Sequence, residues 1–166
     1  MLPKWDKTFS VHNAKIDEQH KKLFELAGKV EYLIDKPVYK DEIKNLLAEF
    51  FNYMKDHFYE EERYMELIKY PDIETHKKIH KHIIQSMIEL IKNIKSTNDL
   101  KEKLYLAVKK WLLEHILYED MKVEQYRRSS LASEDDKEVS FEEEGDEELE
   151  NAVYLYICKC SGAIHD

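Results

Sequence analysis

Apolar residues recur at steps of three and four along most of the chain up to residue 127, which is the period of a helix with one buried face. The first such stripe begins beside Asp17, a residue type that caps helices well, and Pro37 closes the segment. The stripe consists of Ile16, His20, Leu23, Phe24, Ala27, Val30 and Ile34. It predicts an amphipathic first helix that starts near Asp17 and ends before Pro37.

A second and longer stripe follows Asp41, which can cap another helix. Its members are Ile43, Leu46, Leu47, Phe50, Met54, His57, Phe58, Glu61, Met65 and Ile68. The dipeptide Tyr70-Pro71 should end this helix, because the residue before a proline is displaced from the helical region of backbone space. We therefore predict a helical break between the second stripe and the third.

The third stripe predicts a helix over about residues 72–95, and it consists of Ile73, His76, His80, Ile83, Met87, Leu90 and Ile94. Residues 96–99 then form a turn whose side chains can cap a fourth helix, which should reach about residue 127. The predicted inner face of this helix holds Leu104, Val108, Trp111, His115 and Tyr118, with Leu112 and Ile116 beside them. Helices two, three and four would thus follow one another with short turns between them.

Four helices of roughly 20 to 30 residues with short connections favour an all-α fold, an antiparallel up-down four-helix bundle. Residues 1–16 precede them as an N-terminal extended arm, with Trp5, Phe9 and Val11 spaced for packing onto the bundle. The composition agrees, since 3 Gly and 3 Pro leave little material for the many turns of an all-β fold. We expect one domain over residues 1–127.

The formal charge of −9 is unevenly distributed, because residues 127–166 contain 4 Lys or Arg and 12 Asp or Glu. The remaining body is nearly neutral, so it offers no electrostatic footprint for nucleic acid or for anionic lipid. No apolar run approaches the length of a membrane span, and the first residues lack the apolar run of a signal peptide. We expect a soluble cytoplasmic protein.

Residues 128–166 are predicted to be an acidic C-terminal extension, largely a linker or a disordered segment. Both cysteines of the chain, Cys158 and Cys160, lie here, so the body is not a disulfide scaffold. The pair resembles one knuckle of a rubredoxin-like iron site, but it is Cys-x-Cys instead of Cys-x-x-Cys and no second pair exists. A solvated appendage, a degenerate redox module and a site shared between two chains all remain open.

Polar residues interrupt the apolar stripes of all four helices, and they are of the types that bind metals. A single histidine on an apolar face is commonly a core residue bonded to a neighbour, and a buried glutamate alone would pay several kcal/mol for desolvation. Here no lysine or arginine lies on the stripes to pair with the glutamate. The interrupting residues are His20, His57, Glu61, His76, His80 and His115. Metal ions would satisfy all six at once.

Asp120 is a seventh candidate ligand, five residues after His115. Five residues correspond to about 140° around an ideal α-helix, so spacing alone ranks Asp120 below the other six. It could join them if the two side chains approach from opposite flanks or if the helix is locally irregular. The neighbouring acidic residues point away from the stripes and are predicted to lie at the surface: Glu60, Glu62, Glu114 and Glu119.

Seven ligands are too many for one ion and suit two ions that share one or both of the carboxylates. Mixed imidazole and carboxylate ligation favours Fe, Mn or Zn over Ca or Mg, and the absence of thiolate disfavours Cu(I). The di-iron carboxylate bundles built on Glu-x-x-His pairs are a poor match, since no Glu-x-x-His occurs in this chain.

These motifs resemble the hemerythrin family, most closely its single-domain prokaryotic members, the bacteriohemerythrins. The resemblance covers residues 5–127 and rests on Asp-Glu-Gln-His at 17–20, His-Phe-Tyr-Glu-Glu at 57–61, Tyr70-Pro71 with His76 and His80, and Trp-Leu-Leu-Glu-His-Ile at 111–116 with Asp120. It implies a four-helix bundle with a non-haem di-iron centre that binds O₂ reversibly. By the family's pattern, one iron would be held by His76, His80 and His115 and the other by His20 and His57, with Glu61 and Asp120 bridging them.

The resemblance further implies an O₂-binding protein for storage, delivery or scavenging, and not an enzyme. The predicted pocket around O₂ is apolar, with lining residues Phe58, Ile83, Trp111 and Leu112, and it contains no obvious general acid. Leu112 could be a gate above the irons or plain core. The alternatives are a di-iron enzyme that handles peroxide or NO, and an O₂ or iron sensor whose output is the tail. An oxygen-using enzyme or a reductase is the expected kind of protein partner.

Overall fold

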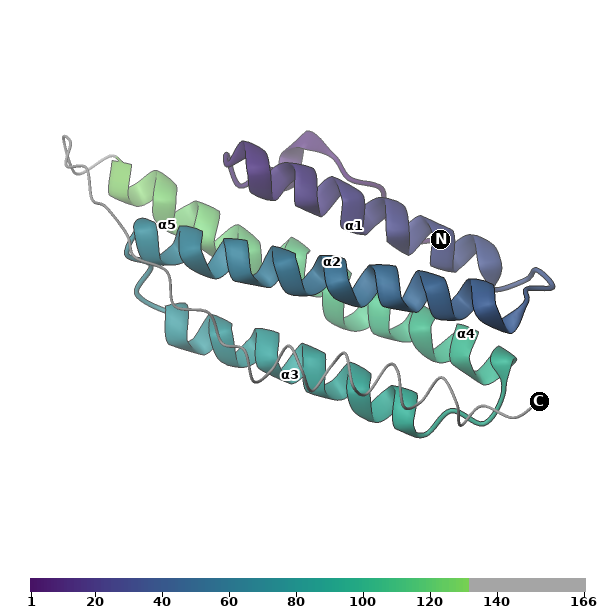
Figure 1. Cartoon of the computed structure of the whole chain (residues 1–166). Coiled ribbons are helices and arrows are strands. Elements are labelled where there is room, and N and C mark those ends of the chain that lie inside the picture. Colours follow the sequence, from purple (N-terminus) through teal and green to yellow (C-terminus); the bar gives the residue numbers. More distant parts are fainter. Residues whose placement is uncertain (132–166) are drawn as a thin grey trace.

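Four long helical rods make up the body of the protein (Figure 1). A computed structural model describes residues 1–131, apart from the side chain of Trp111, and the predicted acidic extension with Cys158 and Cys160 lies outside the described residues. The first three rods are α1 (Ala14–Leu33), α2 (Lys40–Leu67) and α3 (Ile73–Lys92). The fourth is continuous through α4 (Thr97–Ala107), η2 (Val108–Leu113), η3 (His115–Asp120) and α5 (Met121–Leu131).

The rods pack as the predicted all-α bundle. Helix α2 contacts α1, α3 and α4, and α4 also contacts α1 and α3, so the second and fourth rods lie between the other two (Figure 1). The interior is filled by the predicted stripes, with Leu23, Phe50 and Ile83 at most 3% exposed. Tyr118 was predicted to face inward and is 67% exposed, so that part of the prediction was wrong.

The helix starts differ from the predicted ones at two places. Helix α1 begins three residues before Asp17, because the Asn13 side chain accepts hydrogen bonds from the first turn. Asp17 instead accepts hydrogen bonds from the Val11 amide at 2.9 Å and from the Ser10 hydroxyl at 2.6 Å. Helix α2 begins at Lys40, one residue before the predicted cap Asp41. These two predicted caps were therefore wrong. Asp17 instead fastens the N-terminal arm to the first turn of α1.

The predicted break between α2 and α3 is present around Tyr70-Pro71. Helix α2 ends at Leu67, and Lys69 adopts a left-handed backbone with φ of 54°. The amide of Lys69 donates to Glu66 O at 3.0 Å and that of Tyr70 to Met65 O at 2.9 Å, which satisfies carbonyls that the helix leaves free. The tight reversal sets α3 back against α2.

The N-terminal arm packs onto the body and contains one short 3₁₀ turn, Lys7–Phe9. Val11 and Leu2 are buried, and the Phe9 ring stacks on Phe24 with the centroids 5.9 Å apart. At the end of the arm, His12 has a left-handed backbone and its Nδ1 lies 2.8 Å from Glu124 Oε1 on α5. The arm thus ties the first rod to the last.

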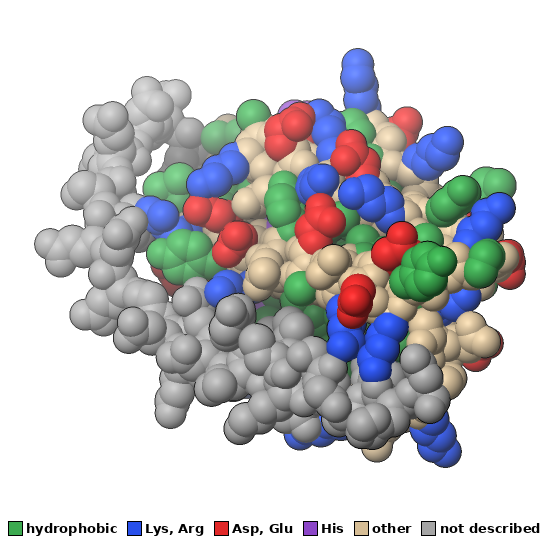
Figure 2. Space-filling model, turned by 45° about the vertical axis from the view of Figure 1, so that its right-hand side comes forward, with side chains coloured by type: hydrophobic (Ala, Val, Ile, Leu, Met, Phe, Trp, Pro, Cys, Tyr) green, Lys and Arg blue, Asp and Glu red, His purple; other side chains and the backbone are tan. Residues whose placement is uncertain are grey.

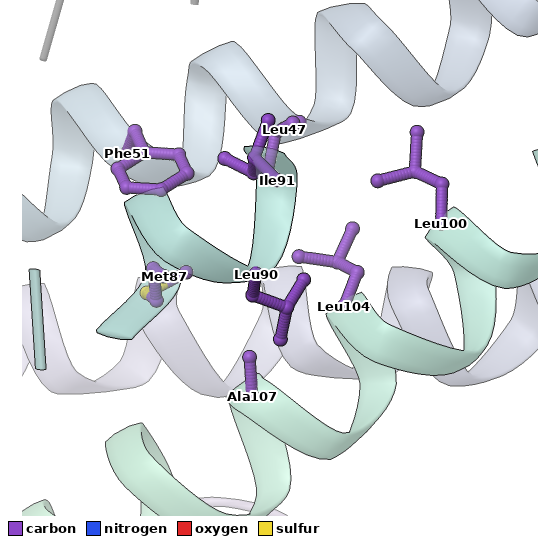
Figure 3. A pocket seen from close by; sticks show the side chains of 8 residues that line it. All are labelled: Leu47, Phe51, Met87, Leu90, Ile91, Leu100, Leu104 and Ala107. Carbon is purple, nitrogen blue, oxygen red and sulfur yellow. The ribbon is translucent and has the colours of Figure 1, made fainter. Parts of the chain in front are cut away.

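The described part of the surface mixes charges of both signs, and one small apolar pocket lies between the helices. On the face shown in Figure 2, lysine and arginine side chains are interspersed with aspartate and glutamate, in keeping with the near-neutral body. A small apolar pocket between α2, α3 and α4 is lined by Leu47, Phe51, Met87, Leu90, Ile91, Leu100, Leu104 and Ala107 (Figure 3). None of the helices within residues 1–131 is both long enough and apolar enough to cross a membrane.

Glu124 is a charged residue that the fold buries at the junction of arm and last helix. Its side chain is 1% exposed and accepts hydrogen bonds from Arg127 Nε at 2.7 Å and Arg128 Nε at 2.6 Å. Burial raises the pKa of Glu124, but the two arginines outweigh it and hold the pKa below the ordinary value of 4.5. The Glu124 carboxylate therefore stabilises the fold in its ionised form.

Replacing Glu124 with glutamine should lower the free energy of unfolding at neutral pH by about 1 to 3 kcal/mol, because charge-assisted hydrogen bonds are lost. Since the folded-state pKa is depressed, this contribution is present above the unfolded-state value of 4.5 and disappears as the pH falls through the folded-state pKa. Urea unfolding of metal-free wild type and E124Q, at pH 7 and at successively lower pH, should show the difference shrinking.

The matched control is E66Q, which removes an exposed ion pair between Glu66 Oε1 and Lys77 Nζ at 2.7 Å. It should cost less than about 1 kcal/mol, because exposed pairs contribute little. An E124Q difference that is constant with pH would contradict the assigned role of the Glu124 charge.

Candidate metal centre

Seven side chains of the types that bind metals meet in the bundle interior, and each is at most 4% exposed. All four rods contribute to this cluster, which consists of His20, His57, Glu61, His76, His80, His115 and Asp120. The structure thus brings together every residue predicted to be a ligand, including the doubtful Asp120. Their ligand atoms form two groups, each compact enough to hold one ion.

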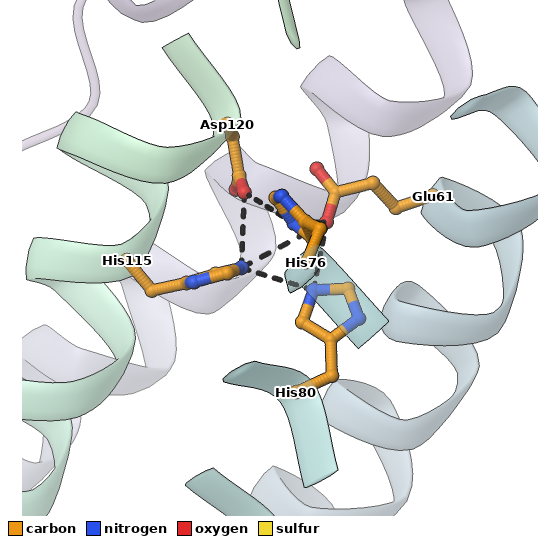
Figure 4. A group of neighbouring side chains, drawn as sticks. All are labelled: Glu61, His76, His80, His115 and Asp120. Carbon is orange, nitrogen blue, oxygen red and sulfur yellow. Dashed lines mark hydrogen bonds and ion pairs between the residues drawn. The ribbon is translucent and has the colours of Figure 1, made fainter. Parts of the chain in front are cut away.

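The first group joins three imidazoles from two rods to both carboxylates (Figure 4). His76 Nε2 lies 3.3 Å from Glu61 Oε2 and 3.3 Å from Asp120 Oδ1. His80 Nε2 is 3.1 Å from Glu61 Oε2, and His115 Nε2 is 3.0 Å from Asp120 Oδ1. The Nε2 atoms of His80 and His115 are themselves 2.9 Å apart. All three rings therefore present the same nitrogen to one point.

The second group contains two imidazoles and the same two carboxylates. His20 Nε2 lies 3.2 Å from Asp120 Oδ2 and 3.9 Å from Glu61 Oε1, and His57 Nε2 lies 4.0 Å from Glu61 Oε2. Asp120 thus presents Oδ1 to the first group and Oδ2 to the second. That arrangement suits a carboxylate that binds two ions at once.

A change of helical period explains how Asp120 reaches the cluster. The segments Val108–Leu113 and His115–Asp120 are π-helical, with hydrogen bonds from residue i to residue i+5. In a π-helix, residues five apart lie nearly above one another, so His115 and Asp120 share the inner face. Of the two ways in which Asp120 could join His115, the structure shows the locally irregular helix. The same change of period turns Tyr118 outward.

Two imidazoles are held from behind by side chains that the stripe pattern did not single out. His80 Nδ1 lies 2.7 Å from Glu62 Oε1, and His57 Nδ1 lies 3.2 Å from Gln19 Oε1. Glu62, which was predicted to be a surface residue, is partly exposed, and its carboxylate also contacts a cluster histidine. Gln19 and Glu62 are each next to a cluster residue in the sequence. The apolar pattern does not reveal their contacts, because neither residue belongs to an apolar stripe.

The charges of the cluster are strongly coupled. Burial lowers the pKa of His57 to about 3, and the neighbouring His20 adds to this shift. Burial acts in the same direction on His76, but the Asp120 and Glu61 carboxylates outweigh it and raise the pKa of His76 to about 10. The imidazoles in turn hold the pKa of both carboxyls below the ordinary range, despite their burial. Both carboxylates are therefore ionised and available to a cation.

Several buried polar atoms of the cluster have no hydrogen-bond partner among the described residues, which is unusual for a protein interior. They are His20 Nδ1, His20 Nε2, His57 Nε2, His115 Nδ1, Asp120 Oδ1 and Asp120 Oδ2. Most are lone-pair donors directed at the two groups. Because metal ions bind such atoms, the donor set fits a pair of ions better than it fits a closed hydrogen-bond network.

Three of the four predicted lining residues are buried, and one of them, Phe58, contacts the cluster directly. The Phe58 ring stacks on His80 with centroids 3.8 Å apart and an interplanar angle of 8°. Ile83 is 3% exposed and Leu112 is fully buried, and both belong to the same hydrophobic core as Phe58. The fourth, Trp111, has a side chain outside the described part of the structure. Whether these residues contact a bound gas molecule stays a prediction.

Comparison with known proteins agrees with this geometry. Residues 11–126 match a family model described as the hemerythrin HHE cation binding domain. A bacteriohemerythrin of Campylobacter jejuni is 36% identical over 122 residues, which span 73% of this chain and 92% of that protein. A bacteriohemerythrin of Clostridium acetobutylicum is 36% identical over 122 residues (70% and 94%), and a myohemerythrin of Theromyzon tessulatum 34% over 118 residues (71% and 88%).

The matched region contains all seven cluster residues, and the hemerythrin domain is a helical bundle that holds a non-haem di-iron centre. This chain is bacteriohemerythrin-like and belongs to the hemerythrin family.

Proposed function

We propose that this protein binds O₂ reversibly at its di-iron centre, for oxygen storage, delivery or scavenging, and that it is not an enzyme. The observation that carries the proposal is the unequal split of five imidazoles around two shared carboxylates. In the proposed assignment, His76, His80 and His115 would hold one iron, His20 and His57 would hold the other, and Glu61 and Asp120 would serve both. The position with only two imidazoles would have room for a small ligand.

When bound, the two ferrous ions supply the electrons and the open coordination position that O₂ binding requires. The protein's own contribution is to fix the ligand nitrogens and to exclude water. Phe58, Ile83 and Leu112 are buried and cannot transfer protons, which favours release of O₂ over its reduction. Residues 1–127 are proposed to perform this function, with residues 128–166 as an acidic extension. The protein is proposed to be cytoplasmic. Its proposed protein partner is a reductase or an oxygen-using enzyme.

The colour of the protein should follow the O₂ supply through repeated cycles. Anaerobically reduced protein should be nearly colourless, become coloured when O₂ is admitted, and bleach again when O₂ is removed. Absorption spectra recorded over several cycles check this. Irreversible oxidation without a coloured oxygenated form would contradict reversible binding and would favour a di-iron enzyme.

Replacing His76 with alanine should lower the iron content from two ions per chain towards one, because one of the three imidazoles of the first group is lost. The control is H82A, since His82 is exposed and its Nε2 lies 3.4 Å from Ser86 on its own helix. Iron determination on folded protein, with helicity checked by circular dichroism, provides the measurement. Two irons retained in H76A would refute the assignment of His76.

Acid should release the iron, because imidazole must be deprotonated to bind a metal. Without metal, His76 has a pKa of about 10 and holds a proton that the ion must displace at neutral pH. The metal affinity therefore falls as the pH falls, and loss should be extensive below the ordinary histidine pKa of about 6.5. Iron content after dialysis at stepped pH tests this, and full retention at about pH 4 would argue against ligation by five histidines.

A further inference from the structure

The two groups of ligands differ in the side chain that supports an imidazole from behind. His80 in the first group donates its Nδ1 hydrogen to Glu62 Oε1 over 2.7 Å, since a carboxylate can only accept. His57 in the second group donates to the amide oxygen of Gln19 over 3.2 Å. One metal position thus has a charged supporting residue and the other a neutral one.

The support of His80 is the more complete of the two. Glu61 and Glu62 are consecutive residues of α2, yet they reach opposite nitrogens of the same ring, with Glu61 Oε2 3.1 Å from Nε2. Phe58, one turn earlier on α2, stacks on the face of the ring. The orientation of the His80 ring is therefore set by three side chains of one helix before any ion binds.

A carboxylate behind a metal-binding imidazole does more than orient it. Accepting the outer N–H makes the other nitrogen a stronger donor, and loss of such a partner typically weakens metal binding by about 10- to 100-fold. A neutral amide orients the ring in the same way but polarises it less. The difference between Glu62 and Gln19 therefore favours the ion of the first group.

We propose that Glu62 is a positioning residue that makes the two metal positions unequal, so that the position of His76, His80 and His115 fills first and holds its ion more tightly. This inference rests on the proposed function, because it takes over the assignment of the ligands to two ions. It separates a firmly held ion from a more labile one on the side proposed to bind O₂. The charge of Glu62 acts in addition to the third imidazole of that group.

The test is a competition titration of the full-length, metal-free protein with Zn²⁺ against a chromophoric chelator, which yields two stepwise affinities. In E62A and E62Q, the tighter affinity should fall by about 10- to 100-fold while the weaker one stays the same. In Q19E, the weaker affinity should rise. The matched control is E66Q, which removes a bond between α2 and α3 one turn further along without touching a cluster residue. Its two affinities should equal those of the wild type.

A second measurement separates positioning from a general role in folding. In Zn²⁺-loaded, ¹⁵N-labelled protein, the ring signals of His80 should show the proton on Nδ1, with slow exchange against water. E62A should lose this protection, E62Q should keep much of it because the amide oxygen still accepts, and the His57 ring signals should not change. If E62A does not fold, E62Q alone decides the outcome.

The proposal is overturned if E62A and E62Q bind both zinc ions as tightly as the wild type, or if E66Q weakens binding as much as they do. It is equally overturned if the His80 signals are the same in all variants. If E62A and E62Q bind zinc more weakly as expected, but the wild-type protein shows no reversible colour change with O₂, the proposed function alone is refuted. The two failures are therefore distinguishable.

Discussion

Two buried carboxylates shared by five imidazoles are the interaction on which the rest of the molecule depends. Glu61 and Asp120 have no lysine or arginine partner in the cluster, so among the described residues the compensation for their burial comes from the surrounding imidazole rings. The five imidazoles come from all four rods. The position of each rod is thus fixed at one common level by polar contacts, while the hydrophobic core fixes it along the remaining length.

Phe58 connects these two regions of the bundle. It belongs to the hydrophobic core, and its ring also stacks on His80 and meets His115 edge-on at 5.7 Å. Apolar packing therefore continues from the hydrophobic core up to the imidazole rings of His80 and His115. The low pKa of His57 also results from burial, because burial disfavours the charged form and leaves the imidazole neutral.

The sequence pattern predicted the four helices and the six most obvious cluster residues, because apolar periodicity and interruptions of that periodicity are both visible in one dimension. Asp120 could not be placed by spacing, because an ideal α-helix turns 100° per residue and the chain departs from this value between residues 108 and 120. The resemblance to a family supplied that residue. Glu62 was missed because its contact depends on how α3 lies against α2, which no periodicity within α2 reveals. The start of α1 was misplaced because two good capping residues, Asn13 and Asp17, compete within one turn.

The π-helical segments also determine what lies beyond them. Each adds one residue relative to a regular α-helix, so the phase of everything downstream is displaced by about 100° per segment. Helix α5 inherits this displacement, and with it Val123 and Glu124 face the body, where Glu124 meets His12 of the arm. The two π-helical segments therefore determine two contacts at once: they bring Asp120 into the cluster and, about one turn later, they place Glu124 where it meets the N-terminal arm.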